Sequence, residues 1–586
     1  MGRPKTMGYS GALDGIRALA VAVVIAYHAG LAEIPGGFLG VEVFFVVSGY
    51  LITALLDQEL RISDSIDLRS FWRRRFRRLL PAAWAMVLAT SVVTLLFWHD
   101  EAYRLARTVP AAIGYVTNWW FIIAKESYFE AAGRPPLLRH LWSLAIEEQF
   151  YLLLPLALAA LHRAGVSAAQ RAKLAVGLAL GSLLVMGLVF TPFADPTRVY
   201  FGTDTRASGL LFGVALASVY RPWLMPLERE RVPQVDALGA IGLLGLAALF
   251  LWANDYDAFI YRGGMLLVDV ATVLVIIAAV HPAALWRTWL GVAPLRAIGV
   301  RSYSLYLWHW PVFALIRPQI DVPWGPIPTL ALRLAIAVPL AELSYRLVER
   351  PIRAGVPQEW LGRRRREIRA PGDLRPPERI ALGASSVALI AVVIGLVTAT
   401  EPKQETPPAP ATTSTAPTTT SIAGTTTTTA APSDHLYFLG DSVLLGISPT
   451  LKGALPTATV NAKVGRQFNQ GRDIVRFLDS RDQLPTTKIV VMLGANGPID
   501  ESAVSDMVGR TGPDRIWFVN VHTARNWGPA NNEALAALSQ ELGFEVIDWA
   551  SLADAHPEWF RKDGTHPDPD GQRALVDLIA ATLGSA

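Results

Sequence analysis

Long apolar runs recur along the first 400 residues and predict membrane-spanning helices. A helix needs about 20 residues to cross roughly 30 Å of hydrocarbon. The expected spans lie near 13–31, 38–57, 79–98, 142–161, 171–191, 205–220, 235–253, 264–281, 302–317, 327–347 and 379–400. A further apolar stretch at 105–124 is expected to lie along or dip into the outer surface, because another crossing would break the charge alternation of the loops.

Arginine-rich loops follow every second expected span, and such short loops remain in the cytoplasm. The basic residues after the even-numbered spans are Arg69, Arg73, Arg74, Arg75, Arg77 and Arg78, then Arg163, Arg171 and Lys173, then Arg221, Arg229 and Arg231, then Arg287, Arg296 and Arg301, and finally Arg350, Arg353 and Arg363 to Arg366. This pattern places the N-terminus in the cytoplasm. The first span contains Asp14, Arg17 and His28 and is followed by no small-residue cleavage site, so we expect a retained signal anchor.

The pattern changes twice after the last span. Residues 401–433 consist mostly of Thr, Pro, Ala and Ser, which predicts an extended extracellular linker. Short apolar strands then alternate with amphipathic helices, which predicts an α/β three-layer domain with a mostly parallel sheet. The strands are expected at 435–439, 457–462, 488–493, 515–521 and 545–548, and the helices near 469–480, 500–509, 531–543 and 568–583.

The expected fold is therefore a polytopic α-helical membrane domain joined to an extracytoplasmic α/β/α domain. We place the membrane domain at 1–355, a basic cytoplasmic loop at 356–378, the eleventh helix at 379–400, the linker at 401–433 and the α/β domain at 434–586.

The amino-acid composition also indicates that much of the chain lies in a lipid bilayer. Hydrophobic residues make up 52% and charged residues 17% of the 586 residues, which excludes a purely soluble or disordered protein. The absence of cysteine excludes disulfides, thiolate catalysis and cysteine-ligated metals. A net charge of +4 is too small to indicate nucleic acid as a partner. The histidines lack paired spacing, so no metal site is expected.

The α/β domain carries a candidate catalytic set at the ends of its strands. Gly440-Asp441-Ser442 follows the first strand and places a serine at a helix N-terminus. Alone, this turn is more often an ordinary helix N-cap. Downstream, Asp563 and His566 lie on one loop, where Asp563 can orient the imidazole and His566 can take the serine proton.

The ordered motifs GDSV, an isolated Gly, GANG and DGTH resemble the SGNH (GDSL-like) hydrolase family across 434–586. The resemblance implies that Ser442 is the nucleophile, His566 the base and Asp563 its orienter. It also implies an oxyanion hole formed by the backbone N–H groups of Ser442 and Gly465 and the side-chain amide of Asn496, where one donor is typically worth about 3–4 kcal/mol.

Polar residues inside the expected spans are candidates for function, because they are costly in lipid. Asp14 and Arg17 either neutralise each other or serve a site near the inner face. His28 lies near the outer face, where Glu42 of the returning span can meet it; alternatively, His28 forms only a hydrogen bond to a neighbouring helix. Glu147 and Glu148 form an acidic pair at the outer start of the fourth span.

The arginines of SFWRRRFRRLLPAAW have two compatible interpretations. They enforce topology, and one or two can turn inward to bind the phosphates of a cytoplasmic acyl-coenzyme A, since guanidinium groups bind phosphate in a bidentate manner.

Seven ordered motifs resemble the acyltransferase type 3 family of membrane O-acyltransferases over about 9–353. They are LDGIRA, YH at 27–28, GFLGVEVFFVVSGYLI, FWRRRFRRLLP, LWSLAIEEQFYLLLP, SYSLYLWHWPVF and LSYRLVERPIR. The resemblance implies transfer of an acyl group, usually acetyl, from the cytoplasmic side to a sugar hydroxyl outside. It makes His28 a catalytic residue, gives Glu42, Glu147 and Glu148 supporting or acid/base roles, and assigns Arg17, Arg74, Arg75 and Arg78 to the donor.

The leading hypothesis is a relay in the bacterial cytoplasmic membrane. Acetyl-CoA binds inside, His28 acts as base or transient acceptor, and Ser442 forms an acyl-serine that acylates an envelope glycan or glycolipid. The linker of about 33 residues has a root-mean-square span of roughly 30 Å, which permits this relay. Two alternatives remain: a membrane acyltransferase with an independent esterase domain, and a glycan or lipid transporter with a sugar-binding domain.

Overall fold

The computed structural model divides the chain into two compact units, with the boundary at residues 402 and 403. We call them the membrane unit and the α/β unit. The structure describes residues 8–31, 33–124, 126, 128, 134–190, 196–224, 229–253, 257–318, 321–356, 376–400, 436–463, 466–480, 484, 488–497, 499–523, 527–560 and 564–584. The expected linker, 401–433, lies outside these residues, as does most of the loop expected at 356–378.

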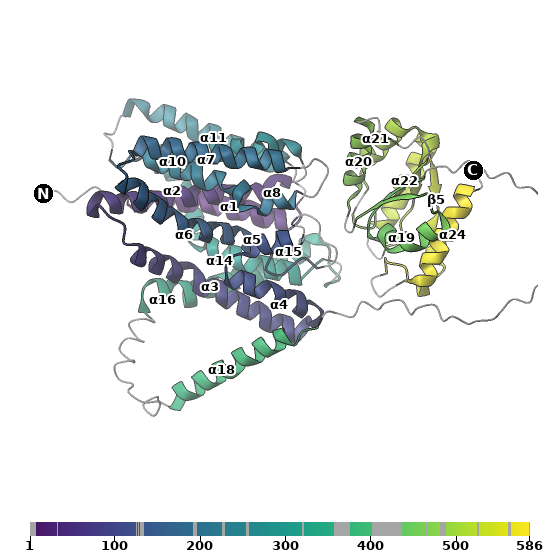
Figure 1. Cartoon of the computed structure of the whole chain (residues 1–586), viewed down its shortest axis with the longest axis horizontal. Helices are drawn as coiled ribbons and strands as arrows, with labels where there is room; N and C mark the ends of the chain where they lie inside the picture. Colours follow the sequence, from purple (N-terminus) through teal and green to yellow (C-terminus); the bar gives the residue numbers. More distant parts are fainter. Residues whose placement is uncertain are drawn as a thin grey trace, which may run out of the picture. The chain divides into compact units, whose positions relative to one another are not determined.

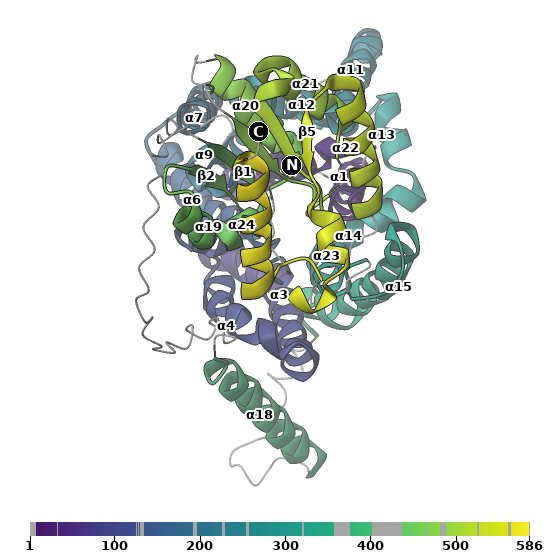
Figure 2. The ribbon, with the colours of Figure 1, turned by 90° about the vertical axis from the view of Figure 1, so that its right-hand side faces the viewer.

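The membrane unit is a bundle of helices (Figure 1). The main helices are α1 (Gly11–His28), α2 (Gly40–Ser63), α3 (Leu68–Phe97), α6 (Leu141–Arg163), α7 (Ala168–Val189), α10 (Ser208–Val219), α11 (Val232–Trp252), α12 (Met265–Val280), α14 (Ala293–Leu315), α15 (Pro326–Ser344) and α18 (Pro376–Val397). Shorter helices connect them, namely α4 (His99–Ile113), α5 (Thr117–Ile123), α8 (Thr197–Phe201), α9 (Thr203–Arg206), α13 (Leu285–Leu290) and α16 (Arg350–Arg353). In both overall views α18 diverges from the bundle, and its contacts are with α3 and α4 (Figure 1 and Figure 2).

Each of the eleven expected spans coincides with one main helix of the described part of the chain. Eight described helical segments are long and apolar enough to cross a membrane; they are Gly11–His28, Pro35–Ser63, Leu68–Phe97, Leu141–Arg163, Ala168–Val189, Arg229–Trp252, Ile260–Val280 and Pro326–Arg353. Crossings by α10, α14 and α18 stay predictions. The stretch 105–124 is broken between α4 and α5, and each of these two helices is too short to cross alone.

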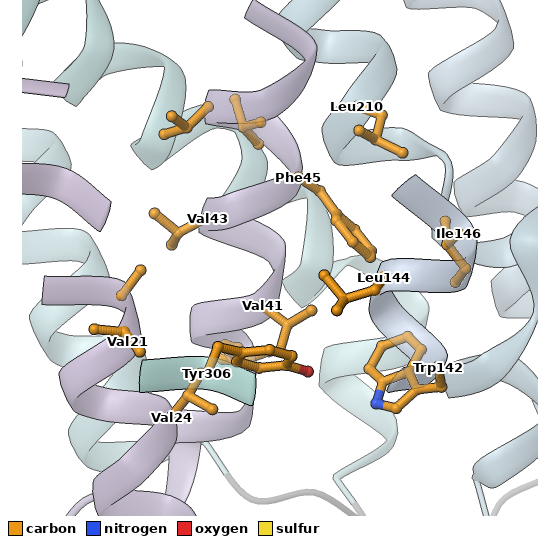
Figure 3. Close-up of a cluster of buried hydrophobic side chains, with 14 of the residues drawn as sticks. Val21, Val24, Val41, Val43, Phe45, Trp142, Leu144, Ile146, Leu210 and Tyr306 are labelled. Atoms are coloured by element: carbon orange, nitrogen blue, oxygen red, sulfur yellow. The ribbon is translucent and has the colours of Figure 1, made fainter. Parts of the chain in front are cut away.

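Apolar side chains from α1, α2, α6, α10 and α14 form one buried cluster inside the membrane unit (Figure 3). Val21 and Val24 of α1 and Phe45 of α2 belong to the same buried cluster as Trp142 of α6 and Tyr306 of α14. Because lipid is as apolar as this core, tight packing rather than the hydrophobic effect holds such helices together.

Two glycines allow α2 and α10 to approach closely. A methyl group on Gly49 would overlap the backbone carbonyl of Leu210, and one on Gly213 would overlap the carbonyl of Val46. Small residues at such crossings let backbones touch and increase van der Waals contact between helices in a membrane. The position of α10 against α2 therefore depends on the absence of side chains at Gly49 and Gly213.

The α/β unit is a parallel five-stranded sheet between two layers of helices. The strands are β1 (Tyr437–Gly440), β2 (Thr459–Ala462), β3 (Ile489–Met492), β4 (Ile516–Val519) and β5 (Glu545–Ile547), in the order β2-β1-β3-β4-β5. The helices are α19 (Ser442–Ala454), α20 (Phe468–Ser480), α21 (Glu501–Thr511), α22 (Gly528–Leu542), α23 (Trp549–Asp554) and α24 (Pro569–Gly584). The predicted fold class is confirmed, and all five strands and all four helices expected from sequence are present.

Successive strand residues point to opposite faces and build two separate cores. Phe438 and Val490 pack with residues of α19 and α24, whereas Leu439 and Val491 pack with residues of α20, α21 and α22. The chain reverses its direction of travel across the sheet beside β1, which is the place where parallel sheets bind ligands at their carboxyl edge.

We expect Gly213→Val to destabilise the membrane unit, because the new side chain would push α10 from α2. Overpacking of this kind typically costs about 1–3 kcal/mol. The midpoint temperature of thermal unfolding of the variant in detergent should be lower than that of wild type. It is measured from the fraction of protein that still elutes as a monodisperse peak in size-exclusion chromatography after heating. Gly177→Val is the matched control, since a Cβ atom there meets nothing within 4 Å. Equal midpoints for the two variants would contradict the packing argument.

Candidate active sites

A serine and a histidine meet at the carboxyl edge of the sheet in the α/β unit. Ser442 is the first residue of α19 and directly follows the N-cap residue Asp441. Its Oγ lies 2.9 Å from Nε2 of His566. The sequence places these residues 124 positions apart, and the structure brings them together as predicted. Backbone N–H groups at this helix N-terminus are available to stabilise a developing negative charge.

Asp441 connects the serine turn to the loop that carries Asn496. Its carboxylate accepts a hydrogen bond from the Val443 N–H at 2.9 Å and another from Nδ2 of Asn496 at 3.0 Å. The side chain is 1% exposed, and this burial raises the pKa of Asp441 to about 6 against the two hydrogen bonds that oppose the shift. One N–H of the Asn496 amide is thereby occupied by Asp441, which orients the amide beside the serine turn.

The loop of Asn496 is held in place by Asn531 of α22, which the sequence did not single out. Asn531 donates to the carbonyls of Gly494 and Gly497, both at 3.0 Å, and accepts from the Ile499 N–H at 2.8 Å. Gly494 has φ of +116°, a conformation that favours glycine. Nothing in the local sequence marks Asn531, because its partners lie more than 30 residues away.

Arg466 is a second supporting residue that the sequence did not reveal. Its buried guanidinium donates to the carbonyl of Gly440 at 2.9 Å and to Oδ1 of Asn461 at 2.7 Å. It therefore ties the chain after β2 to the end of β1, next to the serine turn. Two predicted site residues lie outside the described residues. They are Gly465, which was predicted to donate to the oxyanion hole, and Asp563, which was predicted to orient His566.

In the membrane unit, His28 at the end of α1 lies between two polar side chains. Its Nδ1 is 2.8 Å from Nε2 of His309 on α14, and its Nε2 is 2.9 Å from the hydroxyl of Tyr128. Its ring centroid lies 4.6 Å from that of Trp310. His309 escaped the sequence analysis, although the signal was present: a histidine inside an apolar span, the argument that singled out His28.

Glu42 lies in another cluster. Its carboxylate pairs with Arg206 at 2.8 Å and accepts from the Gly209 N–H at 2.9 Å, and both charged side chains are completely buried. Among the described residues, these contacts join α2 to α9 and α10, so the expected meeting with His28 is corrected. The reason is geometric, because Glu42 on the first turn of α2 faces α10 rather than α1.

Three of the four arginines assigned to the donor line one cavity. Arg17, Arg75 and Arg78 surround a space of about 80 Å³ together with Glu147 and Tyr151. The Arg75 guanidinium lies 4.0 Å from the centroid of the Tyr151 ring, so it is fixed inside the bundle. Arg17 also forms an ion pair with Asp14 at 3.2 Å, so neutralisation and cavity lining occur together.

A larger cleft adjoins this cavity at the end of the bundle where α1 begins. It has a volume of about 640 Å³ and shares Arg17 and Arg78 with the cavity. Arg350 and Arg353 also line it. The two spaces are neighbours because they share Arg17 and Arg78, and we call them together the arginine-lined path, with Glu147 on the wall of the smaller one.

Arg74 and Glu148 lie elsewhere. The Arg74 side chain is 61% exposed and pairs with Glu59 at 3.5 Å, so the structure does not bring it into the cavity with the other arginines. The helical period explains this, since Arg74 and Arg75 are about 100° apart on α3 and face different directions. Glu148 is half-buried on α6 beside Glu147 and does not line the cavity.

Comparison with known proteins identifies full-length relatives. Residues 10–346 match the acyltransferase domain family. The peptidoglycan O-acetyltransferase OatA of Listeria monocytogenes is 34% identical to the chain and is covered over 98% of both sequences. The O-acetyltransferase OatA of Staphylococcus aureus is 36% identical, with 98% of this chain and 96% of that protein covered. Both relatives therefore extend over the membrane unit and the α/β unit.

Solved structures resemble the α/β unit alone. The C-terminal catalytic domain of peptidoglycan O-acetyltransferase A from Streptococcus pneumoniae is 24% identical with a TM-score of 0.24, covering 26% of this chain and 94% of that domain. A lipase/acylhydrolase from Enterococcus faecalis is 17% identical with a TM-score of 0.23, covering 26% and 95%. Both scores are low, so the α/β fold rests on the strand order of this chain.

We expect Asp441 to make the α/β unit less stable as the pH rises from 4 to 6. With a pKa of about 6 in the folded state and about 3.9 unfolded, the folded unit binds the additional proton in this window. The free energy of unfolding therefore falls with rising pH by up to about 3 kcal/mol. Urea denaturation of residues 434–586 at several pH values, compared with Asp441→Asn, should show that the variant lacks this slope. The same pH dependence of the unfolding free energy in wild type and Asp441→Asn would contradict the raised pKa of Asp441.

Proposed function

The chain belongs to the acyltransferase family that its residues 10–346 match, and from this membership we propose that it is a transmembrane O-acetyltransferase of bacterial cell-wall peptidoglycan. The donor is acetyl-CoA on the cytoplasmic side, and the acceptor is a sugar hydroxyl outside the membrane. Two full-length relatives named as O-acetyltransferases support the acetyl group, and the name of one supports peptidoglycan as the acceptor. The observation that carries the proposal is that one chain holds an arginine-lined path and a separate Ser–His pair.

The arginine-lined path has the charge and shape that a coenzyme A thioester requires. The guanidinium groups that line the larger cleft suit phosphate oxygens. They belong to Arg350, Arg353, Arg17 and Arg78, and the last two also line the smaller cavity. The smaller cavity beyond them, of about 80 Å³, receives the acyl end of the donor, which then points towards Glu147. The positive-inside pattern of the loops supports a cytoplasmic mouth for this path.

His28 supplies the proton chemistry of the membrane unit in this proposal. It lies at the opposite end of α1 from the arginine-lined cleft, and its Nε2 faces the hydroxyl of Tyr128. An imidazole in this place can take a proton from a hydroxyl group that attacks the thioester, or can accept the acetyl group transiently. The separate pair of Glu42 with Arg206 joins α2 to α9.

Ser442 completes the transfer outside the membrane. Its Oγ attacks the carbonyl of the acetyl group that the membrane unit delivers, while Nε2 of His566 takes the serine proton. Backbone N–H groups of α19 and the Asn496 amide stabilise the resulting oxyanion. The bond between the acetyl carbon and its carrier then breaks, and the carrier leaves with the proton from His566. The acetyl-serine is then attacked by a glycan hydroxyl, whose proton passes to His566 as Ser442 regains its own. The net reaction transfers acetyl from coenzyme A to the glycan and leaves the free thiol of coenzyme A.

The first test measures base-labile acetate on purified cell-wall glycan by mass spectrometry. Wild type is compared with a deletion strain and with the deletion strain carrying Ser442→Ala, all at matched protein levels. We expect acetate to fall at least 100-fold in the deletion and to stay low with Ser442→Ala, because acyl transfer requires the nucleophile. Full restoration by Ser442→Ala would show that the membrane unit transfers the acetyl group alone and that the α/β unit is an esterase or a binder.

The second test concerns the donor. Arg78→Gln should weaken binding of coenzyme A to the purified full chain about tenfold, because Arg78 lines both spaces and a hydrogen bond to a charged group is worth about 1.5–3 kcal/mol. Calorimetric titration measures this affinity. Arg74→Gln is the matched control on the same helix and should bind as wild type, because Arg74 lines neither the cavity nor the cleft. An equal affinity for both variants would leave these arginines as topology signals only.

A further inference from the structure

His309 is anchored to the backbone of its own helix in a way that determines which ring nitrogen carries hydrogen. Its Nδ1 lies 2.8 Å from the carbonyl oxygen of Tyr306 and 3.1 Å from that of Leu305. A carbonyl oxygen only accepts hydrogen bonds, so Nδ1 of His309 must be the donor and carry the hydrogen. The other ring nitrogen, Nε2, is the one that faces His28 at 2.8 Å.

The surroundings of His309 disfavour a second proton on its ring. The side chain is 1% exposed, and burial penalises the charged imidazolium. The Arg139 guanidinium lies 4.2 Å from the centroid of Trp310, whose ring packs on His28, and it adds positive charge to the cluster. His140, with its ring centroid 6.1 Å from that of His309, contributes no negative charge. With its one hydrogen on Nδ1, a neutral His309 presents a lone pair at Nε2.

This lone pair decides the tautomer of His28. A hydrogen bond of 2.8 Å between the two nitrogens needs one hydrogen, and it must come from Nδ1 of His28. The Nε2 of His28 then carries the lone pair and accepts the hydrogen bond from the Tyr128 hydroxyl at 2.9 Å. The unprotonated nitrogen of His28 is thus aimed at a hydroxyl group.

We propose that His309 is a positioning residue that holds His28 in the tautomer whose Nε2 can act as a base. The role of His28 as a base depends on the proposed function. The assignment of its tautomer depends only on the hydrogen bonds described above. The same logic governs a Ser–His–Asp triad, where the third residue fixes the tautomer of the histidine. Here a histidine tied to backbone carbonyls replaces the carboxylate, and it does so without placing a negative charge in the apolar bundle.

Two substitutions at one position separate positioning from packing. The side chain of glutamine reaches about as far as imidazole, and its carbonyl oxygen can accept from Nδ1 of His28, so His309→Gln should keep the tautomer. His309→Leu fills similar space and offers no acceptor. We expect His309→Leu to lower kcat for wall acetylation by at least about 100-fold, the usual scale for general base catalysis, with the KM for acetyl-CoA within about threefold of wild type. His309→Gln should retain activity within about tenfold.

The tautomer is measured directly by nitrogen NMR of the full chain in lipid bilayers, with ¹⁵N-labelled histidine. The signals of His28 are identified by their loss in His28→Ala. Wild type and His309→Gln should show hydrogen on Nδ1 and a lone pair on Nε2, and His309→Leu should show the Nε2-protonated form. A wild-type His28 with hydrogen on Nε2, or an unchanged tautomer in His309→Leu, would overturn the inference.

The two readouts distinguish failure of this inference from failure of the proposed function. If wild type is inactive with acetyl-CoA and the NMR result is as expected, the donor is wrong and the tautomer assignment stands. Equal loss of activity in the Gln and Leu variants, at matched thermal stability in detergent, would contradict the positioning role.

Discussion

Every charged side chain inside the membrane bundle needs a partner within the protein, and this requirement organises the membrane unit. An unpaired ion in apolar surroundings costs several kcal/mol, so the chain can place charge there only where two elements meet. Glu42 and Arg206 meet this requirement with both side chains completely buried. Asp57 of α2 does so at the other end of the helix, where Arg171 lies at 3.0 Å and Arg221 at 2.8 Å. The two clusters fix α2 against α7, α9 and α10.

Close helix packing and charge pairing support each other in this arrangement. Gly49 and Gly213 bring the backbones of α2 and α10 into contact, which lets the Gly209 N–H reach the carboxylate of Glu42 at 2.9 Å. A wider crossing would leave that carboxylate with fewer donors. Around His28 the chain also uses backbone groups in place of a further buried ion, because backbone carbonyls orient His309.

The α/β unit builds its site by a different principle, since a parallel sheet collects the ends of its strands at one edge. Ser442 follows β1 and Asn496 follows β3, which are neighbouring strands, and Asp441 joins the two loops through one carboxylate. Burial of this carboxylate raises its pKa, and Arg466 and Asn531 hold the surrounding loops in place. The Ser442–His566 pair is therefore surrounded by supporting residues from four separate segments of the chain.

The sequence alone determined the main elements of both units and the residues of the Ser–His pair. Apolar runs predicted every main helix of the membrane unit, and short apolar runs between amphipathic helices predicted every strand. The turn at Ser442 with the distant His566 predicted a pair that lies 2.9 Å apart. These signals are local or follow from the rule that parallel strands share an edge.

Only the tertiary structure decided which polar residues meet. It separated Glu42 from His28, turned Arg74 away from the cavity that Arg75 lines, and revealed His309, Arg466 and Asn531 as supporting residues. The physical reason is that a helix or strand pattern reports which face of an element is apolar. The partner of a buried polar group depends instead on the crossing angle and rotation of elements that lie far apart in the chain.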